Sequence, residues 1–152
     1  MFIFTAKLSR KKIAAGLGAA GVLLIGLILM LSGNKAAGSE PSPKGVKTQA
    51  DRIAYLASYG WEADAGSEEC QEVVIPTEFD SVFEGYNNLQ KEQGFDLAKY
   101  KGKRITRYMY VITNHEQTPV YASVLIHKNT VIGGDLQNPA PGGFLRGFKG
   151  RE

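Results

Sequence analysis

"RITRYMYVITNHEQTPVYASVLIHKNTVIGGDL", residues 104–136, decides the fold of this chain, because three strand-like runs follow one another in it. β-branched and aromatic residues are concentrated at about Arg104–Thr113, Pro119–His127 and Thr130–Leu136. Only the dipeptide "KN" separates the last two runs, and Asn129 tolerates the positive φ angle that a two-residue hairpin turn requires. The stretch therefore predicts strands that pair in an antiparallel sheet.

One short helix and one further strand are predicted ahead of this stretch. The helix runs from Thr48 to Tyr59, because Thr48 and Asp51 have the spacing of a capping box. Trp61 follows it and is expected to fill the core. "CQEVVIP", residues 70–76, then has the composition of a strand that a proline closes.

A second helix is predicted to begin at Thr77 and to end at Gly94, with Asp80 completing another capping box. Apolar residues recur in it at steps of three and four, which is typical of one buried stripe; they are Phe79, Val82, Phe83, Tyr86 and Leu89. The order of elements predicts an α+β fold: a small antiparallel sheet of three to four strands with two helices packed on one face.

A run of twenty uncharged residues, Ile13–Ser32, has the length of a transmembrane helix, which spans roughly 30 Å of hydrocarbon. Four basic residues lie in the segment 1–12, so the positive-inside rule predicts a cytoplasmic N-terminus and an extracytoplasmic C-terminal part. A cleaved signal peptide is the alternative, but its apolar core is normally only about 7 to 15 residues long. We favour an uncleaved anchor in the lipid bilayer of the cell membrane.

The remaining boundaries follow from composition. Residues 33–47 are rich in Gly, Ser, Pro and Lys and are predicted to form a flexible linker; residues 48–148 form the extracytoplasmic domain, and residues 149–152 a tail. Beyond the predicted membrane helix, 14 basic residues stand against 15 acidic ones, a net charge of about −1. This balance gives no indication of nucleic-acid binding. Cys70 is the only cysteine, so no internal disulfide forms, and a free thiol at a strand edge is expected.

Several stretches resemble a family of uncharacterised domains in membrane-anchored proteins of Gram-positive bacteria. The long central one is "IPTEFDSVFEGYNNLQKEQGFDLAKYKGKRITRYMY", residues 75–110. "MFIFTAKLSRKK" and "YLASYGWE" precede it, and "VIGGDL" and "GGFLRG" follow it. The resemblance implies a location and a fold, and it implies no catalytic residue or ligand.

Residues with catalytic or metal-binding potential are few. His115 and His127 fall in or beside predicted turns without further ligands at metal spacing, so solvated loop histidines are expected and no metal site or cofactor is predicted. The glycines of "GGD", Gly133–Asp135, expose backbone that a cation or ligand could approach, but a β-bulge or close strand packing is the favoured interpretation. Phe144, Leu145 and Phe148 are expected to fold back over the sheet.

Charge is distributed unevenly along the chain. Ten acids and one base lie between Glu62 and Asp96, whereas five bases and no acid lie in Lys99–Arg107, called the basic segment below. The favoured interpretation is weak surface pairing of these bases with the acids of the first strand or helix. The sharper hypothesis is a ligand-binding rim for an anionic partner. In an extended strand, the rim residues on one face would be Lys101, Lys103 and Arg107, with Arg104 on the other face.

These patterns predict a membrane-anchored extracytoplasmic binding module without catalytic activity. Its partner would be an anionic component of the cell envelope or another envelope protein. An envelope enzyme of the hydrolase type and a structural subunit of a membrane complex are the alternatives. The sequence carries no signal for an oligomeric state.

Overall fold

The structure is a computed structural model that describes residues 41–149. The predicted cytoplasmic segment 1–12, the predicted membrane helix 13–32 and most of the predicted linker lie outside the described residues. Within the described range, no helix combines the length and the apolar composition needed to cross a bilayer.

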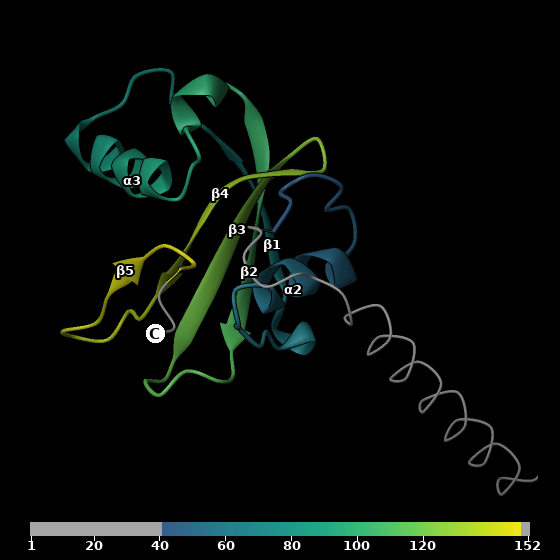
Figure 1. Cartoon of the computed structure of the whole chain (residues 1–152). Helices are drawn as coiled ribbons and strands as arrows, with labels where there is room; N and C mark the ends of the chain where they lie inside the picture. Colours follow the sequence, from purple (N-terminus) through teal and green to yellow (C-terminus); the bar gives the residue numbers. More distant parts are fainter. Residues whose placement is uncertain (1–40, 150–152) are drawn as a thin grey trace, which may run out of the picture. The chain divides into compact units, whose positions relative to one another are not determined.

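Five antiparallel strands form one sheet in which each strand pairs with its neighbours along the chain (Figure 1). Their bounds are β1 Glu69–Val74, β2 Arg104–Ile112, β3 Val120–His127, β4 Thr130–Gln137 and β5 Leu145–Arg146. The α+β class and the antiparallel sheet are confirmed. The prediction of three to four strands missed β5, because a pair of residues is too short to show an alternating pattern.

The hairpin between β3 and β4 is confirmed. His127 pairs with Thr130 across the turn. Lys128 and Asn129 take φ angles of 48° and 60°, the left-handed conformation that matches the twist of the two flanking strands. The register shifts between Leu125, which pairs with Gly133, and Ile126, which pairs with Val131, so Ile132 is the extra residue of a bulge directly before the glycines, and the predicted bulge is also present.

The first helix, α2 (Gln49–Ala57), begins as predicted. Thr48 Oγ1 accepts a hydrogen bond from the backbone of Asp51, whose carboxylate accepts one from the backbone of Thr48. The second helix, α3 (Ser81–Glu92), begins later than predicted, because Asp80 is itself the N-cap and accepts a hydrogen bond from the Phe83 backbone. Two short 3₁₀ helices, η1 (Ala65–Ser67) and η2 (Leu97–Tyr100), follow α2 and α3 respectively.

The two helices lie on opposite faces of the sheet, so the prediction that both pack on one face is wrong (Figure 1). Successive side chains of a strand point to opposite faces. In β3, Val124 packs in the cluster that contains Leu56 of α2, whereas Leu125 packs in the cluster bordered by Phe83 and Tyr86 of α3. Because β3 is covered on both faces, nearly all of its residues are buried.

The core on the α2 face is large and aromatic. Trp61 and Phe148 are fully enclosed, at 2% and 0% exposure, and the Trp61 indole donates a 2.7 Å hydrogen bond to the Phe148 carbonyl. The prediction for Trp61 is therefore confirmed. The C-terminal segment does fold back through Phe148, but Leu145 stays 52% exposed.

The folded unit begins before Thr48, where the sequence places the domain boundary. Val131 donates a backbone hydrogen bond to Pro43, and Val46 donates one to Asn129. Val46 is also buried in the core of the α2 face, at 5% exposure. The last residues of the predicted linker thus belong to the domain.

Candidate functional site

Polar side chains, not an apolar stripe, are the most buried part of α3. Asn87 and Gln90 are 4% and 0% exposed, whereas Val82 of the predicted stripe is 80% exposed. Phe83 and Tyr86 are only partly buried. The predicted stripe is therefore wrong in part: two of its aromatic residues face the sheet, and the closest attachment of the helix is polar.

Gln90 and Gln93 tie the C-terminal half of α3 to the backbone of β4. Gln90 Oε1 accepts a 2.8 Å hydrogen bond from the Gly134 N–H, and Gln93 Nε2 donates a 2.9 Å bond to the Gly134 carbonyl. A Cβ on Gly133 would lie 2.9 Å from Gln90 Oε1, and one on Gly134 would lie 2.2 Å from the Phe148 ring. The predicted close packing at these glycines is confirmed.

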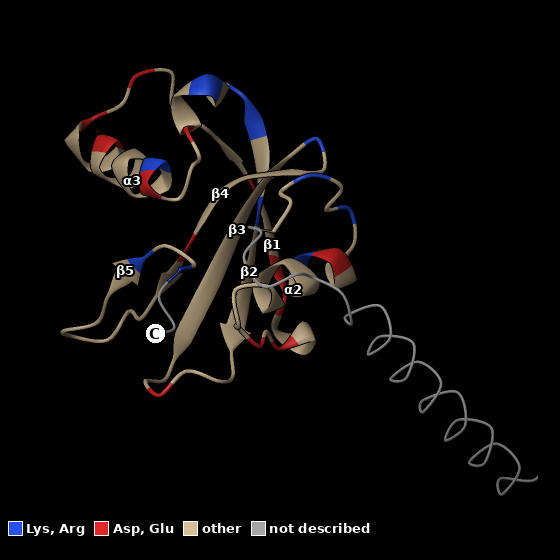
Figure 2. Ribbon diagram, viewed as in Figure 1, with Lys and Arg blue, Asp and Glu red and all other residues tan. Residues whose placement is uncertain are grey.

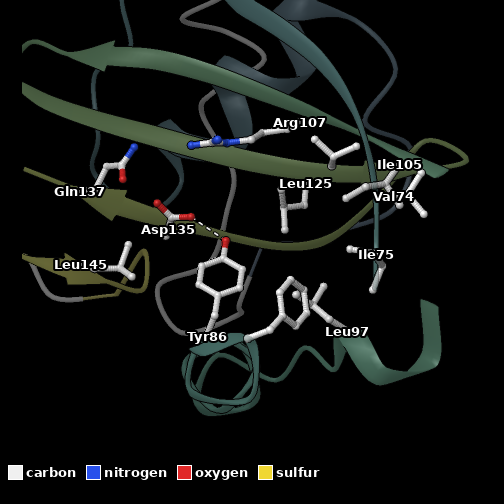
Figure 3. Close-up of a pocket in the computed structure, with 12 residues that line it drawn as sticks. Val74, Ile75, Tyr86, Leu97, Ile105, Arg107, Leu125, Asp135, Gln137 and Leu145 are labelled. Atoms are coloured by element: carbon white, nitrogen blue, oxygen red, sulfur yellow. Dashed lines mark hydrogen bonds between the residues drawn. The ribbon is translucent and has the colours of Figure 1, made fainter. Parts of the chain in front are cut away.

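A cleft of about 320 Å³ separates α3 from the sheet (Figure 3). The lining residues come from the five strands, from the chain just after β1, and from α3 and η2. They are Val73, Val74, Ile75, Phe83, Tyr86, Leu97, Ile105, Arg107, Leu125, Asp135, Gln137 and Leu145. Two large apolar side chains of this lining, Val74 and Leu145, are exposed to solvent at 57% and 52%. The cleft is thus mainly apolar and open to the surface.

Polar groups converge at one end of this cleft. Figure 3 shows Tyr86 extending from α3 to Asp135, with Arg107 and Gln137 on the sheet side of the same end. The Tyr86 hydroxyl donates a 2.6 Å hydrogen bond to Asp135 Oδ2. The second carboxylate oxygen, Oδ1, is buried and has no hydrogen bond of normal length within the described chain, although the Ser123 hydroxyl lies near enough to Asp135 to lower its pKa. Because a buried carboxylate oxygen normally has a donor, Oδ1 is the unusual atom of the cleft.

Arg107 lies beside this carboxylate and is held by β3. Its Nε and Nη2 atoms donate hydrogen bonds of 3.2 and 3.0 Å to Ser123 Oγ. Nη2 also contacts the Met109 sulfur at 3.7 Å, whereas Nη1 has no partner among residues 41–149. Ser123 stands directly opposite Asp135 in the β3–β4 register. The end of the cleft therefore holds one carboxyl, one guanidinium and one phenol.

Burial changes the acidity of both groups on the Tyr86–Asp135 bond. Burial raises the pKa of Asp135, and the hydrogen bond from Tyr86, the charge of Arg107 and the Ser123 hydroxyl oppose this rise. Burial also raises the pKa of Tyr86, and the Asp135 charge adds to that effect. The phenol therefore remains a hydrogen-bond donor, and the carboxyl group carries the perturbed titration of the cleft.

The predicted rim residues do not come together. Only Arg107 lines the cleft. Lys101 and Lys103 are exposed and flank a turn at Gly102, whose φ is +72°, so the extended backbone assumed for them begins only at Arg104. Lys101 Nζ instead lies 4.5 Å from the centre of the Phe79 ring.

The rest of the basic segment gathers where β2 begins, near the β3–β4 turn (Figure 2). Burial lowers the pKa of His127, and the charges of Lys103 and Lys128 lower it further. Arg104 forms a 3.4 Å ion pair with Glu72 of β1, and both side chains are exposed, at 71% and 68%. That pair is the surface pairing that the favoured interpretation predicts.

The other candidates have structural surroundings. His115, predicted as a solvated loop residue, is partly buried; its ring stacks on Trp61 at 5.7 Å and its Nε2 lies 3.0 Å from an Arg146 nitrogen. Cys70 is a free, exposed thiol on the edge strand β1, as predicted. The residues that the structure describes contain no group of three metal-ligating side chains.

Tyr86 and Asp135 escaped the sequence analysis as a pair. Tyr86 fits the periodicity of a buried stripe, and Asp135 appeared only within the "GGD" tripeptide. One signal was available: "VYASVLI" is apolar in both alternating phases, which is typical of a strand that is covered on both faces. That pattern would have placed a second helix over the face that carries Asp135.

The geometry defines a class of small α+β domain: a five-stranded antiparallel sheet with one helix on each face and a cleft beneath the second helix. Residues 55–136 match the family model described as domain of unknown function (DUF4830), and the chain belongs to this family. The matched range includes every residue that lines the cleft except Gln137 and Leu145. No curated protein and no solved structure matches the chain.

Proposed function

We propose that this chain is a membrane-anchored extracytoplasmic binding module and that the cleft beneath α3 is its binding site. The observation that carries the proposal is the buried Asp135 Oδ1, an acceptor that receives no hydrogen bond of normal length from residues 41–149 and lies at the polar end of an apolar cleft. Small-molecule sites have volumes of roughly 300–1,000 Å³, mostly apolar walls and a few convergent polar groups. The cleft meets each of these conditions.

Binding fits the polar end better than nucleophilic catalysis. Ser123 is the one hydroxyl beside the carboxylate apart from Tyr86, and its oxygen accepts two hydrogen bonds from Arg107. A serine nucleophile instead needs a base that removes its proton and leaves its lone pairs free to attack. The guanidinium occupies those lone pairs.

An envelope enzyme is the second candidate, and one observation favours it. Asp135 is a buried carboxyl in a cleft with a raised pKa, which is a frequent property of catalytic acids and bases. Turnover of any substrate by the full chain that is lost in Asp135→Asn would support this candidate over the binding module.

Methyl groups in the cleft report on binding directly. We expect members of a fragment library to shift the methyl resonances of Val74, Ile105 and Leu125 in the full chain, held in lipid nanodiscs. The methyl resonances of Val82 are the control and should not shift, because Val82 is 80% exposed and does not line the cleft. Fragments that shift only methyls outside the cleft, or none at all, would refute the proposed site.

Cys70 tests the proposed location. It is the only cysteine in the sequence and its thiol is exposed. In intact cells expressing the chain, a membrane-impermeant maleimide is expected to label Cys70, with Cys70→Ser as the unlabelled control. Labelling only after lysis would refute the extracytoplasmic location, whatever the cleft binds.

A further inference from the structure

The polar end of the cleft is lined by a buried acceptor, Asp135 Oδ1, and by the guanidinium of Arg107 (Figure 3). In the described part of the chain, Asp135 Oδ1 is buried without a hydrogen bond of normal length, and the hydrogen bonds of the partly buried Arg107 involve Nε and Nη2 but not Nη1. Arg107, Asp135 and Tyr86 line the same end of the cleft (Figure 3), and the Arg107 charge lowers the pKa of both Asp135 and Tyr86. A ligand that satisfies both atoms needs a donor and an acceptor on neighbouring atoms.

We propose that the cleft selects an uncharged amide group attached to an apolar body. The amide N–H would donate to Asp135 Oδ1, and the amide oxygen would accept from Arg107 Nη1. The apolar body would lie along Ile105, Leu125 and Leu97, which line the remainder of the cleft. This inference rests on the proposed function, because it assigns a ligand class to the same site.

Charge balance is the reason for choosing an amide over a charged group. A carboxylate ligand would pair with Arg107 but would meet the negative Asp135, and an ammonium ligand would pair with Asp135 but would meet Arg107. Each charged ligand would also lose its hydration on entering an apolar cleft. An amide satisfies both partners without net charge, so neither cost arises.

Three compounds with the same branched apolar body test this selection: 4-methylpentanamide, 4-methylpentanoate and 4-methylpentylamine. They would be titrated into the full chain in nanodiscs while the methyl resonances of Ile105 and Leu125 are followed. We expect the amide to bind about tenfold more tightly than either charged compound, because each charged compound meets a like charge in the cleft and the amide does not. Equal or tighter binding of a charged compound by the wild-type chain would overturn the inference.

Two substitutions should change the order of binding in opposite directions. Asp135→Asn removes the negative charge and leaves Arg107, so the carboxylate should become the tightest ligand. Arg107→Gln leaves Asp135, so the amine should become the tightest. Arg104→Gln is the matched control, because Arg104 lies on the same strand but pairs with Glu72 at the surface.

The two variants keep the test decisive if one of them fails to fold. Asp135 accepts the Tyr86 hydrogen bond, whereas Arg107 is only partly buried, so Arg107→Gln is the safer substitution. An unchanged order of binding in a folded Arg107→Gln would overturn the amide assignment. If library fragments enter the cleft but the amide does not, the inference fails and the proposed function stands. If nothing enters the cleft, both fail.

The amide could belong to a free small molecule or to a polypeptide. A blocked pentapeptide, acetyl-Ala-Ala-Leu-Ala-Ala-amide, distinguishes the two sources. Tighter binding than 4-methylpentanamide would support the amide class with a polypeptide as its source. Weaker binding, with the amide preference retained, would support the same class in a free small molecule.

Discussion

The two faces of the sheet are built from the same strands but differ in how a helix packs on them. On the α2 face, thirteen buried residues form one cluster around Trp61, Tyr110 and Phe148. On the α3 face, the buried cluster has five members, and Gln90 and Gln93 connect the helix to β4 through hydrogen bonds. One face therefore supplies most of the apolar burial that stabilises the fold, and the other leaves a cleft.

Buried polar groups differ between the faces in the same way. Arg52, at 5% exposure on the α2 face, donates to Glu68 at 2.9 Å and to the Tyr110 hydroxyl at 2.8 Å, and it lies 3.6 Å from the centre of the Tyr108 ring. The Tyr110 hydroxyl also donates to Glu68. Within the described residues, Asp135 on the α3 face keeps one buried oxygen without a hydrogen bond of normal length. The carboxylate of the α2 face is thus paired with a guanidinium, whereas the buried carboxylate of the α3 face is hydrogen-bonded to a phenol through one oxygen.

The largest expected effect lies on the α2 face. Phe148→Ala should lower the free energy of unfolding by about 3–5 kcal/mol, because it removes a fully enclosed ring and leaves a cavity beside the rings of Tyr55 and Tyr59. Urea unfolding followed by the fluorescence of Trp61, the only tryptophan, measures the loss. Leu145→Ala, at a half-exposed position three residues earlier, is the control and should cost far less. Equal effects of the two substitutions would break the distinction between the faces.

A smaller loss is expected where polar groups attach α3. Gln90→Leu keeps an apolar side chain of similar size but removes the acceptor of the buried Gly134 N–H, which should cost about 1–3 kcal/mol. Amide hydrogen exchange at Gly134 should accelerate in this variant. The control is Asn88→Leu, at an exposed position of the same helix. A stabilised Gln90→Leu variant would show that packing, not hydrogen bonding, limits the attachment of α3.

The two faces should respond to pH with opposite signs. Hydrogen bonds from Tyr110 and Arg52 outweigh the effect of burial and lower the pKa of Glu68 from its ordinary value of 4.5. Glu68 therefore contributes stability above pH 4.5, and this contribution is lost as the pH falls through the lower pKa of the folded state. Burial raises the pKa of Asp135 from its ordinary value of 3.8, so its contribution is present below pH 3.8 and is lost as the pH rises through the higher, folded-state pKa.

Unfolding measurements across pH 2–7 separate these contributions. Glu68→Gln should be less stable than the wild type at neutral pH, and the difference should shrink in acid. Asp135→Asn should gain stability relative to the wild type as the pH rises above 3.8. The same direction of change in both variants would contradict the assignment of paired and unpaired carboxylates to the two faces.

Local signals in the sequence predicted local structure well. Thr48 with Asp51 fixed the start of α2, and Asn129 fixed the turn of the hairpin, because each depends only on neighbours in the chain. The start of α3 was misplaced because Thr77 and Asp80 have the capping-box spacing, whereas the backbone satisfied by Asp80 is that of Phe83.

Long-range pairing limited the prediction of the candidate site. Arg107 was identified from its charge, but its partner Ser123 is 16 residues away and its neighbour Asp135 lies on a third strand. The Tyr86–Asp135 bond joins residues 49 apart, which no periodicity reveals. Charge patterning found one group of the site, Arg107, and only the register of the sheet shows which residues lie beside it.

The smallest effect on stability is expected outside both faces, in the exposed basic segment. The double variant Lys101→Gln, Lys103→Gln should change the free energy of unfolding by less than about 1 kcal/mol, since its main contact is one exposed cation–π pair with Phe79. Its binding to poly-glutamate, a soluble anionic probe, should nevertheless weaken at low salt. The full chain in nanodiscs of uncharged lipid is suited to this measurement.

Salt separates a binding rim from an ordinary solvated surface. The Debye length falls from about 10 Å at 0.1 M to about 3 Å at 1 M, so the difference between the wild type and the double variant should vanish at 1 M. Lys91→Gln is the matched control, because this lysine on α3 is the single base among ten acids. Arg107→Gln should behave like that control, since its guanidinium is held by Ser123 within the cleft. Equal binding by the wild type and the double variant at low salt would remove the basic segment from the binding surface and leave the cleft as the candidate site.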